Sequence, residues 1–243
     1  MDYKQIINAC EESKHLISMI PIERVVEFGW QVGLNETTSV LDLCCGYGEM
    51  LKLWNEAFSV NGVGIDREPD FIENGKSRIK NDRVTLITGD VFAYENADKF
   101  DVVVCTELSG GSPGHRLFEH FSEGISLLEQ FVRPGGKLVF GKLFSKFPNP
   151  PQELIDFDGA LPTLCEIYEE VRKYGYYITA MASDNVVQWE TYIMWSAKRD
   201  LEKLRKNPND RKTAEWLDKW YRIYFEYRRQ YEGWGLFAIE KVF

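Results

Sequence analysis

Short apolar segments that alternate with helical stretches constrain the fold of this 243-residue chain more than any other sequence feature. Helical stretches of ten to twenty residues, among them 49–58, 69–80 and 117–132, separate these segments. Such alternation is typical of βαβ units, in which helices cover both faces of a parallel sheet. The sequence therefore predicts an α/β doubly wound sheet whose seven strands cover residues 39–44, 60–65, 84–88, 100–105, 137–144, 176–181 and 235–242.

Helical segments before and after the sheet complete the predicted architecture. Residues 3–33 show apolar side chains at helical spacing and predict two helices, the second of which Pro21 would open and Gly33 would close. A helix over 164–174 precedes an aromatic-rich helical stretch, which a turn at 207–210 breaks into two helices. We expect N-terminal helices (1–35), a core (36–184), an α-helical cap insertion (185–232) and a last core strand (233–243).

Composition and charge exclude several classes of protein. The chain carries 29 Lys and Arg against 38 Asp and Glu and is therefore acidic. Proteins that bind along a nucleic-acid backbone are basic. No run of about 18 apolar residues could span a membrane, and the N-terminus lacks the apolar region of a signal peptide. Five cysteines without a CxxC pair and three histidines without a Cys or His cluster favour free thiols and no metal site. We therefore expect a cytoplasmic protein.

The segment from Val40 to Gly48 carries the strongest functional signal. Gly46 and Gly48 stand at a strand-to-helix turn, where a ligand can approach the backbone and the free N–H groups of the helix start. A dinucleotide site would have a third glycine where this chain has Leu51. Asp42 would repel a pyrophosphate but would attract an ammonium and a sulfonium. The motif therefore favours a cationic ligand over a dinucleotide.

Two further acids follow the next two predicted strands. Asp66 stands 20 residues after Gly46, where a carboxylate can accept hydrogen bonds from both hydroxyls of an adenosine ribose. Asp90 can accept a hydrogen bond from an adenine amino group, with the apolar Val91 beside the ring. An acid after a strand also commonly caps the following helix. Three such acids in successive loops nevertheless indicate one adenosyl site at the carboxyl ends of the strands.

In combination these motifs resemble class I S-adenosylmethionine-dependent methyltransferases over about residues 36–145. The resemblance implies that the Asp42–Gly48 loop, including Cys44, holds the methionine half of the cofactor, which leaves as S-adenosylhomocysteine. It implies Asp66 and Arg67 beside the ribose, Asp90 and Val91 beside the adenine, and Glu107 facing the methyl group and acceptor. The bulky Cys44-Cys45 pair replaces the small residues that the family often has. The aromatic insertion before Gly233–Ala238 is similar to that of one bacterial branch of the family. The motifs that carry the resemblance are 40–48, 64–66, 89–91, 100–107 and 133–138.

The methyl acceptor is less constrained by the sequence. A sulfonium is a good leaving group, so alignment and exclusion of water suffice for transfer, and a strong base is optional. His115, in the glycine-rich loop after Glu107, could serve as a general base, or it could cap the following helix. The strand before Glu107 lacks a D/N-P-P-Y motif and a Pro-Cys pair, which disfavours methylation of DNA bases.

The aromatic helical insertion allows two interpretations. Its Trp and Tyr side chains could pack two helices onto the sheet, or they could form a lid around an apolar acceptor. Its basic residues, Arg228 and Arg229 among them, are expected to form a solvated face. We expect SN2 transfer of a methyl group to O or N of a small molecule, with no membrane partner and no nucleic acid. The alternatives are a non-catalytic S-adenosylmethionine-binding protein and an RNA or protein methyltransferase.

Overall fold

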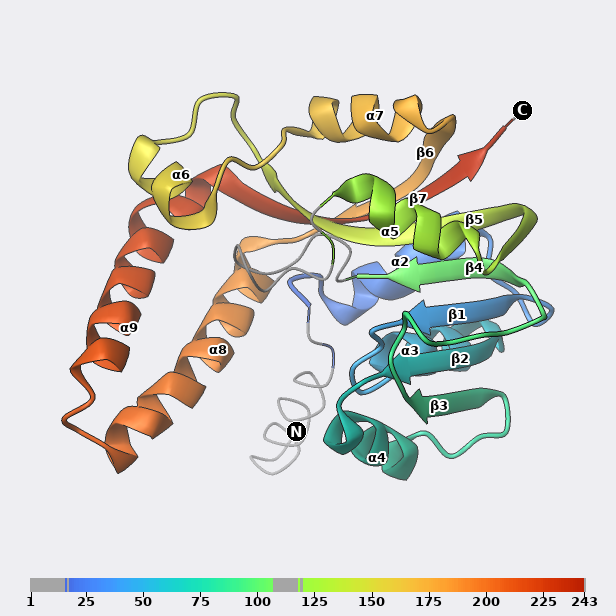
Figure 1. Ribbon diagram of the computed structural model, residues 1–243, viewed down its shortest axis with the longest axis horizontal. Coiled ribbons are helices and arrows are strands. Elements are labelled where there is room, and N and C mark those ends of the chain that lie inside the picture. Colours follow the sequence, from blue (N-terminus) through green and yellow to red (C-terminus); the bar gives the residue numbers. More distant parts are fainter. Residues whose placement is uncertain (1–15, 17, 107–117, 119, 243) are drawn as a thin grey trace.

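The computed structural model describes residues 16, 18–106, 118 and 120–242 of the chain, which form one seven-stranded sheet with helices on both faces (Figure 1). The strand order is β3-β2-β1-β4-β5-β7-β6. Neighbouring strands are parallel except β7, which runs antiparallel to both β5 and β6. The predicted α/β doubly wound sheet is thereby confirmed. The strands are β1 (Ser39–Leu43), β2 (Asn61–Asp66), β3 (Val84–Thr88), β4 (Phe100–Cys105), β5 (Val132–Ser145), β6 (Tyr176–Ser183) and β7 (Glu232–Lys241).

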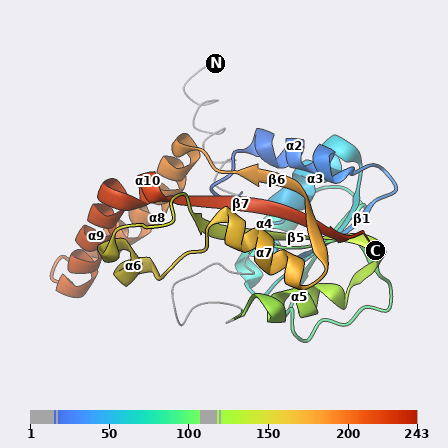
Figure 2. The same ribbon diagram turned by 90° about the horizontal axis from the view of Figure 1, so that it is seen from above.

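The helices form the two outer layers, which Figure 2 shows with α2 and α3 on one face of the sheet and α5 and α7 on the other. Local sequence signals define several of their ends, such as Gly33, which ends α2 in a left-handed conformation. Asn185 and Asp210 accept N-cap hydrogen bonds at the starts of the two cap helices. The helices are α2 (Ile22–Val32), α3 (Glu49–Phe58), α4 (Pro69–Arg78), α5 (Phe121–Glu129), α6 (Gln152–Asp158), α7 (Leu164–Lys173), α8 (Val186–Lys206), α9 (Arg211–Ile223), the π-helix η1 (Tyr224–Arg228) and α10 (Arg229–Tyr231).

Strand residues alternate between two apolar cores, one on each face of the sheet. The α2-side core joins side chains of α2, α3 and α4 to Val40, Val102 and Val104. The α5-side core joins α5 and α7 to Leu41, Val103 and their neighbours. Because side chains of a strand alternate in direction, this division also fixes the face on which each polar residue of a strand lies.

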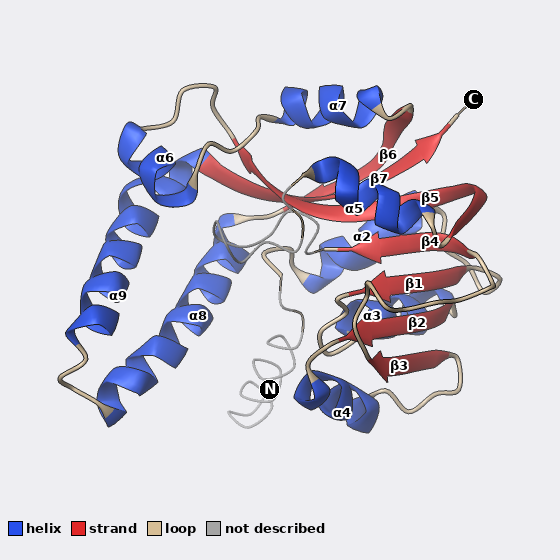
Figure 3. Cartoon of the chain, in the orientation of Figure 1, coloured by secondary structure: helices blue, strands red, loops and turns tan. Residues whose placement is uncertain are grey.

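The helices α8 and α9 form a hairpin beyond the ends to which β1–β4 point (Figures 1 and 3). The first turns of α8 belong to the α2-side core through Trp189 and Ile193, and the π-helix adds the buried Tyr224. Farther out, Trp216 and Phe225 are exposed. Some aromatics therefore pack the hairpin onto the core and others do not. No helix in the described part of the chain is long and apolar enough to cross a membrane.

The structure differs locally from several predictions. The helix expected over 117–132 ends at Glu129, because Val132 already pairs with Phe100 of β4. The strand expected from Lys137 therefore begins at Val132, and residues 133–136 bulge out of its pairing with β4. The short helix α6 was not predicted, because the proline-rich segment before it resembles a loop.

Gly75 allows α4 to contact the turn after β1. A Cβ atom on Gly75 would lie 2.5 Å from the carbonyl oxygen of Tyr47 and 2.6 Å from Cδ1 of Leu86. We expect Gly75→Ala to lower the free energy of unfolding by about 1–3 kcal/mol through overpacking, although alanine favours helices. Urea unfolding measures the change, with Gly89→Ala as control, because a Cβ there would come no closer than 3.8 Å to another atom. Equal effects of the two substitutions would contradict this account.

Candidate active site

A buried acid marks the carboxyl end of β1. Asp42 is only 2% exposed, and its Oδ1 atom has no hydrogen-bond partner among the described residues. Burial raises the pKa of Asp42 well above its usual range, and the negative charge of Asp66 raises it further. A cation placed beside Oδ1 would satisfy this oxygen and favour the ionised carboxylate.

Asp66 closes the glycine turn that follows β1. Its Oδ2 atom accepts a hydrogen bond from the Gly46 N–H at 2.8 Å, and its Oδ1 atom accepts one from the Glu68 N–H at 3.0 Å. Gly46 and Gly48 both have positive φ, and a Cβ on Gly48 would lie 2.8 Å from Leu86. Asp66 therefore joins the ends of β1 and β2, and each of its oxygens retains a further lone pair for a ligand.

The two cysteines between Asp42 and Gly46 adopt different conformations. Cys44 has a φ of 64°, a left-handed conformation that is costly for a residue with a side chain. Cys45 donates its N–H to the Ile65 carbonyl at 3.0 Å. Burial raises the pKa of the Cys45 thiol, and the nearby carboxylates raise it further, so this thiol stays protonated. The pair therefore combines a strained backbone at Cys44 with a protonated thiol at Cys45.

The other residues predicted to contact the adenosyl group are Asp90 and Val91, which follow β3, and Arg67, which is exposed. Asp90 is exposed, and its Oδ1 atom accepts the Phe92 N–H at 3.0 Å. Val91 is buried in the α5-side core, so the exposed ring of Phe92 is the apolar surface next to Asp90. Arg67 is 83% exposed at its side chain and pairs with Glu68. The roles assigned to these residues stay predictions.

The structure brings together five of the predicted site residues at the ends of β1 and β2, and Asp90 and Val91 follow β3 at the same edge of the sheet. The predicted acceptor-side residue Glu107 and the candidate base His115 lie outside the described residues. The five residues brought together are Asp42, Cys44, Gly46, Gly48 and Asp66.

A second group of charged residues, which the sequence did not reveal as a site, lies where the hairpin joins the sheet. We call it the cap-junction cluster: Lys146, Asp158, Asp184, Arg228 and Glu232. Arg228 was expected on a solvated face, but its side chain is 13% exposed and pairs with Asp158. Glu232 is 3% exposed at the start of an apolar strand. An acid at a buried strand position was the one sequence signal that could have indicated this cluster.

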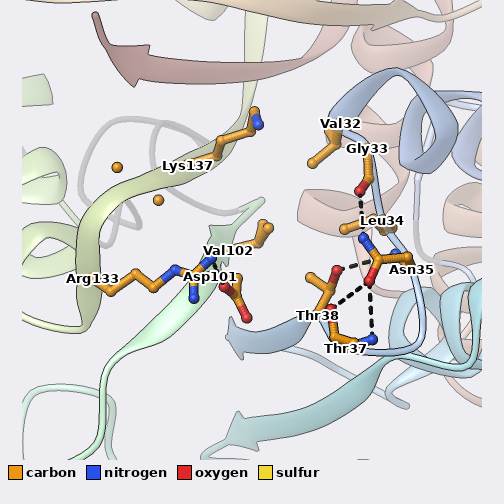
Figure 4. A pocket seen from close by; sticks show the side chains of 12 residues that line it. Val32, Gly33, Leu34, Asn35, Thr37, Thr38, Asp101, Val102, Arg133 and Lys137 are labelled. Atoms are coloured by element: carbon orange, nitrogen blue, oxygen red, sulfur yellow. Dashed lines mark hydrogen bonds and ion pairs between the residues drawn. The ribbon is translucent and has the colours of Figure 1, made fainter. Parts of the chain in front are cut away.

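A separate pocket of about 280 Å³ lies at the opposite, amino-terminal edge of the sheet (Figure 4). On one wall of the pocket Arg133 pairs with Asp101, whose other oxygen accepts hydrogen bonds from the N–H and hydroxyl groups of Ser39. Asn35 hydrogen-bonds with Thr37 and Thr38 in the adjacent turn. These contacts tie the strand starts together, so we assign this pocket a structural role.

The fold agrees with that of known proteins. A family model described as a methyltransferase domain matches residues 40–136. Structures of S-adenosylmethionine-dependent methyltransferases from Geobacter sulfurreducens and Thiobacillus denitrificans, both in complex with S-adenosylhomocysteine, are 26% and 27% identical to this chain. Their TM-scores are 0.80 and 0.79, and the matches cover 98% and 99% of this chain and 98% and 100% of theirs. These similarities define the class of protein as a Rossmann-like methyltransferase.

One curated relative matches nearly the whole chain. The protein YjhP of Escherichia coli K12 is 27% identical over 98% of this chain and 99% of its own length. Taken with the domain match and the solved structures, this similarity confirms the resemblance to class I S-adenosylmethionine-dependent methyltransferases, and the protein is an enzyme.

The strained backbone of Cys44 gives a direct test of the turn geometry. We expect Cys44→Gly to raise the free energy of unfolding by about 1 kcal/mol, because glycine adopts positive φ without a steric penalty. Cys45→Gly is the matched control, and it should destabilise the protein because Cys45 has no positive φ to relieve. Denaturant unfolding of both variants measures the effects. A loss of stability in Cys44→Gly as large as in the control would show that the turn has another conformation.

Proposed function

We propose that the enzyme transfers the methyl group of S-adenosylmethionine to O or N of a small-molecule acceptor by SN2 displacement. The observation that carries this proposal is the buried Oδ1 atom of Asp42, which lacks a partner beside a tight glycine turn. An acid at this place suits the ammonium of the methionine half and opposes the pyrophosphate of a dinucleotide. The residues present therefore fit this cofactor.

Each residue at this edge has a part in the proposed complex. Asp42 would pair with the ammonium, and Asp66 would hold the turn through Gly46 while its free lone pairs accept the ribose hydroxyls. Asp90, with Phe92 and Val91 beside it, would border the adenine. When bound, the cofactor supplies an electrophilic methyl group on a positive sulfur.

The protein's contribution to transfer would be alignment and exclusion of water. The hairpin of α8 and α9 lies on the side of the carboxyl ends, where it can cover an acceptor. Glu107 and His115 stay our candidates for contacts with the acceptor and for a general base. A site covered by this hairpin would favour a small molecule over a large surface.

Replacement of Asp42 should change cofactor binding and protein stability in opposite directions. We expect Asp42→Asn to stabilise the protein without ligand, because a neutral amide replaces a buried carboxyl whose pKa is raised. A raised pKa means that the wild type loses stability as pH rises above the usual carboxyl value, so the gain in melting temperature should shrink below about pH 4. The same variant should bind S-adenosylmethionine at least about tenfold more weakly by calorimetry, since the ammonium loses its charged partner.

The exposed Asp82 provides the control, since Asp82→Asn should change neither property. Unchanged affinity for S-adenosylmethionine in Asp42→Asn would remove the ammonium assignment.

A turnover assay tests the proposed reaction. Purified enzyme with S-adenosylmethionine and a library of small O and N nucleophiles should release S-adenosylhomocysteine together with a methylated product, detected by mass spectrometry. Binding of the cofactor without any product would favour a non-catalytic binding protein. Product formation only with RNA or protein, together with a steep loss of affinity at high salt, would favour the macromolecular alternative.

A further inference from the structure

Buried polar atoms without hydrogen-bond partners gather at the cap junction. Among the described residues, four such atoms belong to this region, and they are Oδ2 of Asp184, Nε1 of Trp189, the hydroxyl of Tyr224 and Oε1 of Glu232. A polar group buried without a partner costs free energy, and most buried polar groups in proteins are paired. Their concentration at one junction indicates a place for a polar ligand.

Two of these atoms are carboxylate oxygens that lie beyond the carboxyl edge of the sheet. Glu232 pairs in register with Ser145 of β5, five residues past Phe140, which is the partner of the last residue of β4. At about 3.3 Å per residue, this is roughly 16 Å beyond the end of β4. The N–H of Asp184 donates to the Trp234 carbonyl at 2.9 Å, which places Asp184 closer to that edge.

Strand alternation places both acids on the same side of the sheet as Asp42. Val40, Ala182 and Trp234 belong to the α2-side core. Asp42, Asp184 and Glu232 each stand two residues from one of them along the chain, so they share its face. The cap junction therefore lies on the same face of the sheet as Asp42 and beyond the carboxyl edge, the side on which an acceptor would lie.

The charges of the cap-junction cluster do not balance. Asp158 engages Arg228 through two hydrogen bonds, one of 2.8 Å between Nε and Oδ2. Glu232 shares a side-chain hydrogen bond with Asp158, and its Oε2 atom lies 3.6 Å from the Arg228 Nε atom. The Lys146 Nζ atom stands 3.9 Å from Oδ2 of Asp184, which is too long for a hydrogen bond. Three carboxyl groups thus face two cations.

Burial also affects the protonation state of Glu232. Burial, together with the charge of Asp158 and the hydrogen bond to it, raises the pKa of Glu232 to about 8, although Arg228 and Lys146 act in the opposite direction. The acid therefore holds a proton at neutral pH and can release it when a cation arrives. The Lys146 side chain is 32% exposed, so the cluster has an approach from solvent.

We propose, on the basis of the methyltransferase function proposed above, that Glu232 and Asp184 bind a protonated amine carried by the methyl acceptor. Three carboxyl groups against two cations, and two carboxyl oxygens without hydrogen-bond partners, match an ammonium group, which can replace the proton of Glu232, donates hydrogen bonds and has no lone pair. The described residues contain no group of three His, Cys, Asp or Glu placed to hold a metal ion, so an organic cation fits better.

Calorimetry with a matched pair of probes tests this inference. Benzylamine and benzyl alcohol have nearly the same shape, but only the amine is charged at neutral pH. In the presence of saturating S-adenosylhomocysteine, the wild type should bind benzylamine at least about tenfold more tightly than benzyl alcohol. Amine binding at pH 7 should also release protons, measured as a dependence of the heat on the buffer, because Glu232 must ionise.

Substitutions at the two acids should remove this preference. Glu232→Gln should abolish the proton release, and both Glu232→Gln and Asp184→Asn should weaken benzylamine binding at least about fivefold without changing the affinity for benzyl alcohol. Glu240→Gln, at the other end of β7, is the matched control and should behave as the wild type. If Glu232→Gln fails to fold, Asp184→Asn decides the result.

The outcomes separate this inference from the proposed function. Equal affinities for the amine and the alcohol, or amine binding that survives in both variants, would overturn the amine site while S-adenosylhomocysteine still binds. Loss of S-adenosylhomocysteine binding by the wild type would instead contradict the proposed function. Tighter amine binding that disappears only in the two acid variants would support the amine site.

Discussion

The hydrogen bond between the Gly46 N–H and the Asp66 carboxylate is the contact on which the candidate site depends. It joins the ends of the neighbouring strands β1 and β2 and fixes the tight turn between β1 and α3. It also places a negative charge near the buried Asp42, which raises the pKa of that carboxyl. The protein therefore holds two acids close together at the sheet edge. Such an arrangement is costly without a positively charged ligand, and it is the physical basis for assigning a sulfonium cofactor.

The surrounding helices maintain this arrangement by close packing. Gly75 of α4 brings the backbone of that helix against the Tyr47 carbonyl, and Leu86 of β3 fills the space that a side chain at Gly48 would need. Buried apolar groups thus hold a loop that has few internal contacts of its own. The cap-junction cluster has a similar electrostatic arrangement, because it also contains two buried acids, Glu232 and Asp184. One sheet face consequently carries unbalanced acids at both ends of the proposed reaction path.

The sequence predicted the sheet and the kind of cofactor well, because local signals determine them. Apolar strands, glycines at a strand-to-helix turn and acids after strands are readable from neighbouring residues, as Gly46 and Asp66 illustrate. The cap junction could not be predicted in this way. Arg228 and Asp158 are 70 positions apart, and only the packing of η1 against α6 buries both. The internal hydrogen bonds of Asp66 were also not foreseen, because the sequence indicates a carboxylate but not which N–H groups it accepts. The left-handed conformation of Cys44 likewise appears only in the folded turn.

A crystal structure of the enzyme with S-adenosylhomocysteine bound is the most direct test of the central claim, because it locates the amino nitrogen of the ligand. We expect that nitrogen within about 3 Å of Oδ1 of Asp42, the range of a charge-assisted hydrogen bond. A ligand whose amino group lies away from β1, with Oδ1 of Asp42 still unpartnered or bonded only to the protein, would contradict the assignment of this buried acid to the cofactor.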